Sequence, residues 1–120
     1  YSNNTYTGKS SDIAHVRTLD FTNQRLTVSD TVSASNHEAI IENFMFFGAR
    51  ELTPTKFELL DRHGAKWGVA TTSSPAHIES EKLYCAEGSL VAIQSSVPVE
   101  STLAKFEMKI NFDLEYKGSS

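Results

Sequence analysis

The sequence predicts an all-β domain, an antiparallel β-sandwich of about eight or nine strands. The clearest evidence is the segment 106–116, where apolar and polar residues alternate with a period of two. Its apolar members are Phe106, Met108, Ile110, Phe112, Leu114 and Tyr116. Because successive side chains of a strand point to opposite faces, this pattern puts one face on a core and one in water. Turn residues also recur at intervals of about 8–12 residues, as in β-sandwiches.

The first two predicted strands form a hairpin. They span residues 14–21 and 25–33, and the polar residues 22–24 between them form the turn. The second strand places three apolar residues on one face, namely Leu26, Val28 and Val32. Asp30 interrupts that face. We expect its carboxylate to accept local backbone hydrogen bonds near the end of the strand.

The remaining strands follow in order along the chain. They are predicted at residues 39–47, 56–61, 66–72, 77–85 and 89–97, before the long final strand. Residues 48–55, which contain Pro54, are predicted to form a loop. Residues 62–65 are predicted to form a tight turn in which Gly64 takes the positive φ.

The length of 120 residues predicts a single domain with a real hydrophobic core. Residues 13–117 form the predicted sandwich domain. Residues 1–12 are polar and aperiodic, so we expect a flexible N-terminal segment, and residues 118–120 are a small polar tail. The first residue is Tyr1 rather than Met, so we expect a piece of a longer chain.

Composition argues against several classes of function. The net charge is −4 and the charges are interspersed, so no basic stripe is present for nucleic acid. No stretch approaches the roughly 18 apolar residues of a membrane span. The four histidines form no metal-ligand motif, and the single cysteine, Cys85, is expected to be a buried small hydrophobe. We therefore predict no cofactor, no metal ligand and no catalytic residue.

One segment is a candidate binding surface. Trp67 is the only tryptophan, and Arg62, His63 and Lys66 lie beside it in the sequence. An exposed tryptophan flanked by cations is one way to hold an acidic sugar, because the ring stacks on the pyranose while the cations bind carboxylate or sulfate. The alternative is that Trp67 fills the core, and Tyr84 has the same two interpretations. These five residues are the predicted glycan contacts.

Three stretches within residues 14–112 carry a family resemblance. They are the run from His15-x-Arg17 to Leu26-x-Val28-x-Asp30-x-Val32, the aromatic region 44–51, and the run from Ile78 through Tyr84 and Gly88 into strands 90–97 and 102–110. The pattern resembles the C-terminal β-sheet domain of the heparinase II/III-like family of polysaccharide lyases. The chain departs from that pattern where residues 85–87 separate Tyr84 from Gly88, and where the aromatic strand lacks the usual histidine of the family.

The resemblance implies a parent lyase with an N-terminal catalytic toroid of α-helices. Such enzymes cleave uronic-acid glycans by β-elimination: a base removes the C5 proton and an acid protonates the leaving oxygen. No position here matches the catalytic Asn, Tyr and His of the family, or its zinc ligands in the preceding sheet. The chain is therefore expected to be a non-catalytic fragment whose partners are that toroid and, through the parent enzyme, an acidic polysaccharide. The resemblance favours a periplasmic or extracellular location.

Two other functions remain open from the residues alone. The first is a free-standing carbohydrate-binding module for acidic glycans, based on Trp67 and its neighbouring cations. The second is a structural or adhesion domain with protein partners, for which only the fold class argues.

Overall fold

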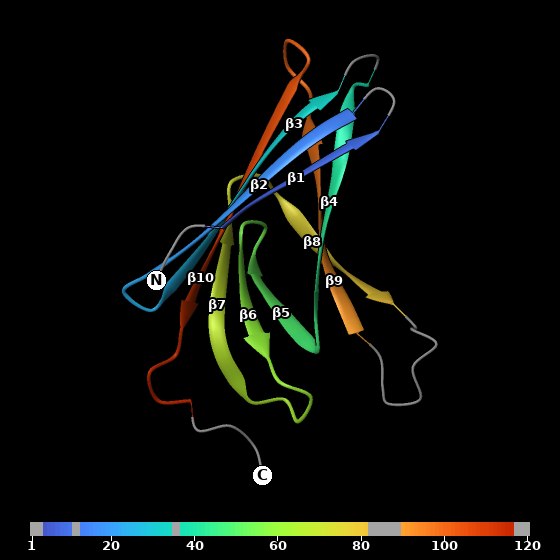
Figure 1. The fold of residues 1–120 in the computed structure, drawn as a ribbon. Helices are drawn as coiled ribbons and strands as arrows, with labels where there is room; N and C mark the ends of the chain where they lie inside the picture. The colour runs from blue at the N-terminus through green and yellow to red at the C-terminus, as the bar shows by residue number, and fades with distance from the viewer. Residues whose placement is uncertain (1–3, 11–12, 35–36, 82–89, 117–120) are drawn as a thin grey trace.

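The computed structural model describes residues 4–10, 13–34, 37–81 and 90–116 (Figure 1). This part of the chain contains ten strands and no helix, so the all-β prediction is confirmed. The strands are β1 (Asn4–Ser10), β2 (Ile13–Thr22), β3 (Arg25–Ala34), β4 (Ala39–Phe46), β5 (Gly48–Thr53), β6 (Lys56–Leu60), β7 (Lys66–Thr72), β8 (Ala76–Glu81), β9 (Leu90–Pro98) and β10 (Leu103–Phe112). Within the same residues, no helix is long and apolar enough to cross a membrane.

The strands form two antiparallel sheets. The larger sheet has the order β1-β2-β3-β10-β7-β6-β5, and the smaller sheet has the order β4-β9-β8. The chain crosses from one sheet to the other between β3 and β4, at Phe47, between β7 and β8, and between β9 and β10. Figure 1 shows that β5, β6 and β7 lie toward the end of the molecule where the chain finishes, whereas β2 and β3 run far toward the opposite end.

The core lies between the sheets. Its buried apolar side chains come from both of them, and the largest are Phe57, Leu59, Ile93 and Met108. In β10, Phe106, Met108 and Ile110 are buried and alternate with Glu107 and Lys109, as the period of two predicts. β10 lies between β3 and β7 and therefore occupies the centre of the larger sheet.

The final strand is shorter than predicted. β10 ends at Phe112, and Leu114 is 74% exposed, so the prediction that residues 113–116 continue the strand is wrong. Asp113 causes the stop, because its Oδ1 accepts a hydrogen bond from the backbone N–H of Glu115 and its carbonyl accepts one from the N–H of Tyr116. An Asp that bonds the backbone two residues later closes a local turn, which replaces the sheet ladder.

Two strands were missed because both are edges of the larger sheet. β1 pairs with β2 from Asn4↔Leu19 to Ser10↔Ile13, where an irregular N-terminal segment was expected. β5 pairs with β6 where a loop was expected, and Pro54 lies in the turn between these two strands. An edge strand is held by backbone hydrogen bonds along one side, so it can form without an apolar alternation.

The turn between β2 and β3 offers a test of stability. Asn23 and Gln24 both have positive φ, 51° and 60°, as in the two-residue type I′ turn. Gln24→Gly is expected to raise the free energy of unfolding by about 0.5–1 kcal/mol, because glycine adopts this conformation without the cost that a side chain imposes. Gly64→Ala is the control: φ there is 86°, so this change is expected to destabilise. Thermal denaturation that ranks the two variants in the opposite order would contradict the prediction.

Candidate functional site

Strand pairing assembles a partly buried polar cluster from His15, Arg17, Asp30 and Glu42. Arg17 of β2 lies directly opposite Asp30 of β3, and His15 lies two residues earlier on the same face of β2. Asp30 alternates with buried Val28 and Val32, so its side chain points between the sheets. Glu42 reaches the cluster from β4 of the smaller sheet. The cluster therefore links the two layers of the sandwich.

Arg17 and Asp30 form a two-pronged ion pair. Arg17 Nε donates to Asp30 Oδ1 at 2.8 Å, and Nη2 donates to Oδ2 at 2.7 Å. The Asp30 side chain is fully buried, whereas that of Arg17 is 31% exposed and its guanidinium lies 4.9 Å from the centre of the Phe44 ring. The expectation that Asp30 accepts local backbone hydrogen bonds is wrong. A fully buried carboxylate needs a charged partner, and here the neighbouring strand provides it.

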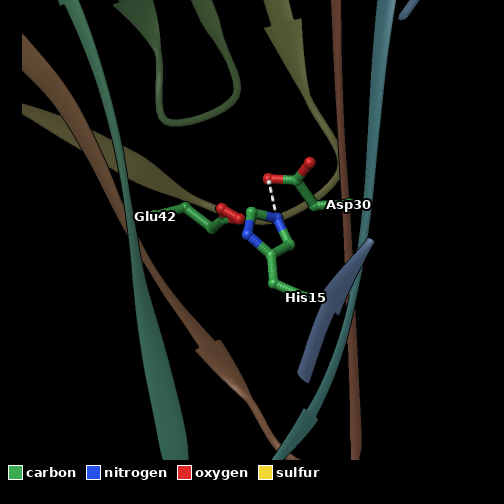
Figure 2. Close-up of side chains that lie close together, drawn as sticks. All are labelled: His15, Asp30 and Glu42. Atoms are coloured by element: carbon green, nitrogen blue, oxygen red, sulfur yellow. Dashed lines mark ion pairs between the residues drawn. The ribbon is translucent and has the colours of Figure 1, made fainter. Parts of the chain in front are cut away.

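His15 and Glu42 complete the cluster in different ways. His15 Nε2 is shielded from solvent and lies 3.3 Å from Asp30 Oδ2, at ion-pair distance but without a well-formed hydrogen bond. Glu42 Oε2 lies 4.0 Å from Arg17 Nη2, and the Glu42 side chain is only 6% exposed. Figure 2 shows the side chains of His15, Asp30 and Glu42 pointing toward one another from three strands. One ligand atom from each of these three residues lies within 4.8 Å of the other two.

The two carboxyl groups of the cluster have pKa values shifted in opposite directions. Burial raises the pKa of Glu42 to about 8, and its hydrogen bond with the Asp30 carboxylate adds to this effect. Burial alone would raise the pKa of Asp30 as well, but hydrogen bonds from Arg17 and Glu42 outweigh it and hold this pKa at about 2. Near neutral pH the pair therefore shares one proton, with Glu42 as the donor and Asp30 as the acceptor.

A small pocket opens beside the cluster. It has a volume of about 350 Å³, and His15 and Glu42 line it together with Val32, His37, Ala39, Ile40 and Ile41. Because His37 and Ile41 are exposed, the pocket reaches the surface of the protein. A small ligand or ion therefore has a route to the buried atoms of His15 and Glu42.

A second, larger pocket lies further along the sandwich. It has a volume of about 630 Å³ and is lined by Met45, Phe46, Phe47, Asp61, Trp67, Leu90, Phe112, Asp113 and Tyr116. We call it the aromatic pocket. Trp67 is half-buried, with ring-centre distances of 5.7 Å to Phe112 and 6.3 Å to Phe46. The Tyr116 hydroxyl donates to Asp61 Oδ2 at 2.9 Å, which joins the chain after β10 to the turn after β6.

The structure does not gather the predicted glycan contacts on one surface. Of the four predicted contacts that the structure describes, only Trp67 lines the aromatic pocket. Lys66 belongs to the opposite face of β7, where its Nζ lies 3.9 Å from Glu58 Oε2, and Arg62 and His63 are exposed in the turn before β7. Tyr84 lies outside the described residues. Among the described residues, the charged groups that line the pocket are the carboxylates of Asp61 and Asp113 rather than cations.

No family model matches the chain, and no curated protein matches it. The heparinase-like resemblance therefore stays a prediction from the residues. Three polar residues that carry the resemblance, His15, Arg17 and Asp30, are members of the four-residue polar cluster. Glu42 was missed, although its inward position between Ile40 and Phe44 in a largely apolar strand is a signal that the sequence carries.

Proposed function

We propose that the chain is the non-catalytic C-terminal β-sandwich domain of a heparinase II/III-like polysaccharide lyase, which supports the catalytic cleft of its parent enzyme. One observation carries the proposal. The polar residues that define the resemblance, His15, Arg17 and Asp30, lie in a partly buried cluster that joins two sheets. Polar residues in such a place specify how strands and layers pack, which is the role of a scaffold.

The aromatic pocket also argues against lyase chemistry within this domain. β-elimination requires that the uronate carboxylate be neutralised, because this lowers the pKa of the C5 proton. Asp61 and Asp113 line the pocket and carry the same charge as a uronate. Like charges repel, so the described pocket disfavours the substrate of such a lyase. The proposal therefore assigns the catalytic groups to the toroid of the parent chain.

The proposal is tested in two steps. The purified chain is first incubated with heparin, heparan sulfate, alginate and hyaluronate, and the ultraviolet absorbance of unsaturated uronate is followed. We expect a folded protein, by circular dichroism, that forms no such product. The coding sequence upstream of Tyr1 is then read, and it should encode a helical toroid. Product formation by the isolated chain, or an upstream sequence without the toroid, would overturn the proposal.

Carbohydrate binding at the aromatic pocket is a second candidate function. Trp67, Phe47 and Tyr116 offer aromatic surface beside the carboxylates of Asp61 and Asp113. Aromatic faces bind the apolar faces of sugar rings, and carboxylates accept hydrogen bonds from sugar hydroxyls. This chemistry fits a neutral glycan better than the acidic glycan that the cations near Trp67 in sequence suggested.

Trp67 fluorescence reports directly on this second candidate, because the chain has no other tryptophan. Titration with neutral and acidic glycans is expected to give a saturable change with a neutral glycan and none with heparin. Phe47→Ala should weaken the response, since Phe47 lines the pocket and is exposed. Lys66→Ala is the matched control and should leave it unchanged, because Lys66 lies on the opposite face of β7. A response that needs an acidic glycan and Lys66 would restore the original prediction.

A further inference from the structure

We propose that His15, Asp30 and Glu42 bind one divalent transition-metal ion, and that Zn²⁺ fits the site best. The three residues come from β2, β3 and β4, so an ion held by them would join the two sheets. This inference goes beyond the proposed scaffold role. It rests on residues of this chain alone.

The ring nitrogen of His15 provides the first argument. Nε2 is shielded from solvent, and although Asp30 Oδ2 lies 3.3 Å away at ion-pair distance, Nε2 makes no well-formed hydrogen bond. A polar atom removed from water without a partner destabilises a fold, and native structures rarely leave one in this state. A metal ion would accept the lone pair of Nε2 in the tautomer that carries its proton on Nδ1.

Distances between the ligand atoms provide the second argument. Zn–N and Zn–O bonds of about 2.0–2.1 Å in a tetrahedron place two ligand atoms about 3.3–3.4 Å apart. His15 Nε2 and Asp30 Oδ2 are separated by 3.3 Å. The Glu42 carboxylate lies within 4.8 Å of both atoms and would have to move closer to them to complete the site. One imidazole and two carboxylates suit Zn²⁺, whereas Ca²⁺ and Mg²⁺ prefer a larger set of oxygen ligands.

The small pocket completes the site. Because His15 and Glu42 line it, an ion bound by them could keep one coordination position open toward the pocket. Three protein ligands with one open position are the usual arrangement of a zinc site that also binds water or a substrate group. The pocket also provides the route by which the ion enters.

Arg17 is a positively charged side chain that would lie next to the proposed ion, because it contacts both Asp30 and Glu42. It holds both oxygens of Asp30, but a carboxylate offers about four lone-pair positions, so Oδ2 can accept from Arg17 and still bind an ion. Arg17 thereby fixes the orientation of Asp30, just as residues that hydrogen-bond a metal ligand, without binding the metal themselves, orient that ligand in other proteins. Its positive charge opposes the ion and lowers the affinity. Near neutral pH Glu42 carries a proton, which must leave when the ion binds. The cluster, including Arg17, then carries one net negative charge, which favours a cation.

The test uses Zn²⁺ in calorimetry and Co²⁺ as a spectroscopic substitute for it. We expect one equivalent to bind, with the visible absorption of four-coordinate Co²⁺ and a rise in melting temperature. His15→Ala and Glu42→Gln should each weaken binding by at least about tenfold. Glu42→Gln keeps the shape of the protonated carboxyl group, so it should fold even if another variant fails. His77→Ala is the control, because His77 and Glu79 form an exposed pair away from the cluster.

Four results would overturn the proposal. The first is no binding of either ion by the wild-type chain. The second is unchanged affinity in folded Glu42→Gln or His15→Ala. The third is a thiolate-to-cobalt absorption band that disappears in Cys85→Ser, which would assign the ion to the cysteine. Loss of binding in His77→Ala with retention in the other variants would assign it to the exposed pair.

Discussion

Arg17→Met is expected to lower the free energy of unfolding by about 3–5 kcal/mol. The substitution leaves the Asp30 carboxylate fully buried without the guanidinium that holds both of its oxygens. Removal of one partner from a buried ion pair costs much more than the pair itself contributes, because the remaining charge has lost both water and its counter-charge. Chemical denaturation of the two proteins, fitted with a common slope, measures the difference.

Arg50→Met is the matched control for this experiment. Arg50 also pairs with a carboxylate, Glu58, through a hydrogen bond of 2.8 Å, but its side chain is 65% exposed. Surface pairs of this kind contribute about 0–1 kcal/mol. The double variant Arg17→Met with Asp30→Leu should recover much of the loss, since an apolar pair can replace a buried ionic one. Equal costs for the Arg17 and Arg50 substitutions would contradict the buried role of Asp30.

The stability of the chain is expected to be highest near pH 4 and to fall as the pH rises toward 8, in a buffer that contains a metal chelator. Glu42 has its pKa raised from 4.5 to about 8, so in this interval the folded chain keeps a proton that the unfolded chain has lost. Stability then decreases with pH, by up to about 1.4 kcal/mol per unit. Above pH 8 the contribution of Glu42 no longer changes.

Asp30 produces the opposite slope in acid. Its pKa is lowered from 3.8 to about 2, so the unfolded chain binds more protons between these values. The stability provided by the Asp30 carboxylate is therefore present above pH 3.8 and is lost as the pH falls through about 2. Denaturation midpoints measured from about pH 2 to 9 test both slopes. Glu42→Gln should flatten the fall in stability between pH 4.5 and about 8. A steep fall in stability over this interval that remains in the variant would refute its assignment to Glu42.

The strands with a buried face could be predicted from the sequence. In β3 and β10 the alternation of apolar and polar residues agrees with the side chains that the structure buries, since one face of each strand packs on the core. The edge strands β1 and β5 lack this pattern. They are held by the backbone of one neighbour, and backbone hydrogen bonds leave almost no trace in the identity of side chains.

The candidate sites were only partly visible in the sequence. The period of two already places Lys66 and Trp67 on opposite faces of one strand, which argued against a joint binding surface. It also places His15 and Arg17 on one face, and Asp30 among inward residues. The aromatic pocket could not be predicted, because its residues come from β4, β7, β9, β10 and the turns beside them, which only packing brings together.

Local side-chain patterns thus determined the fold class, the positions of most strands and the inward direction of Asp30. Tertiary structure decided which charged groups meet. The register of β2 against β3 puts Arg17 opposite Asp30, and the packing of the second sheet brings in Glu42. The physical reason is range: alternation is a property of neighbouring residues, whereas a buried charge is satisfied by whichever partner the packing of distant strands provides.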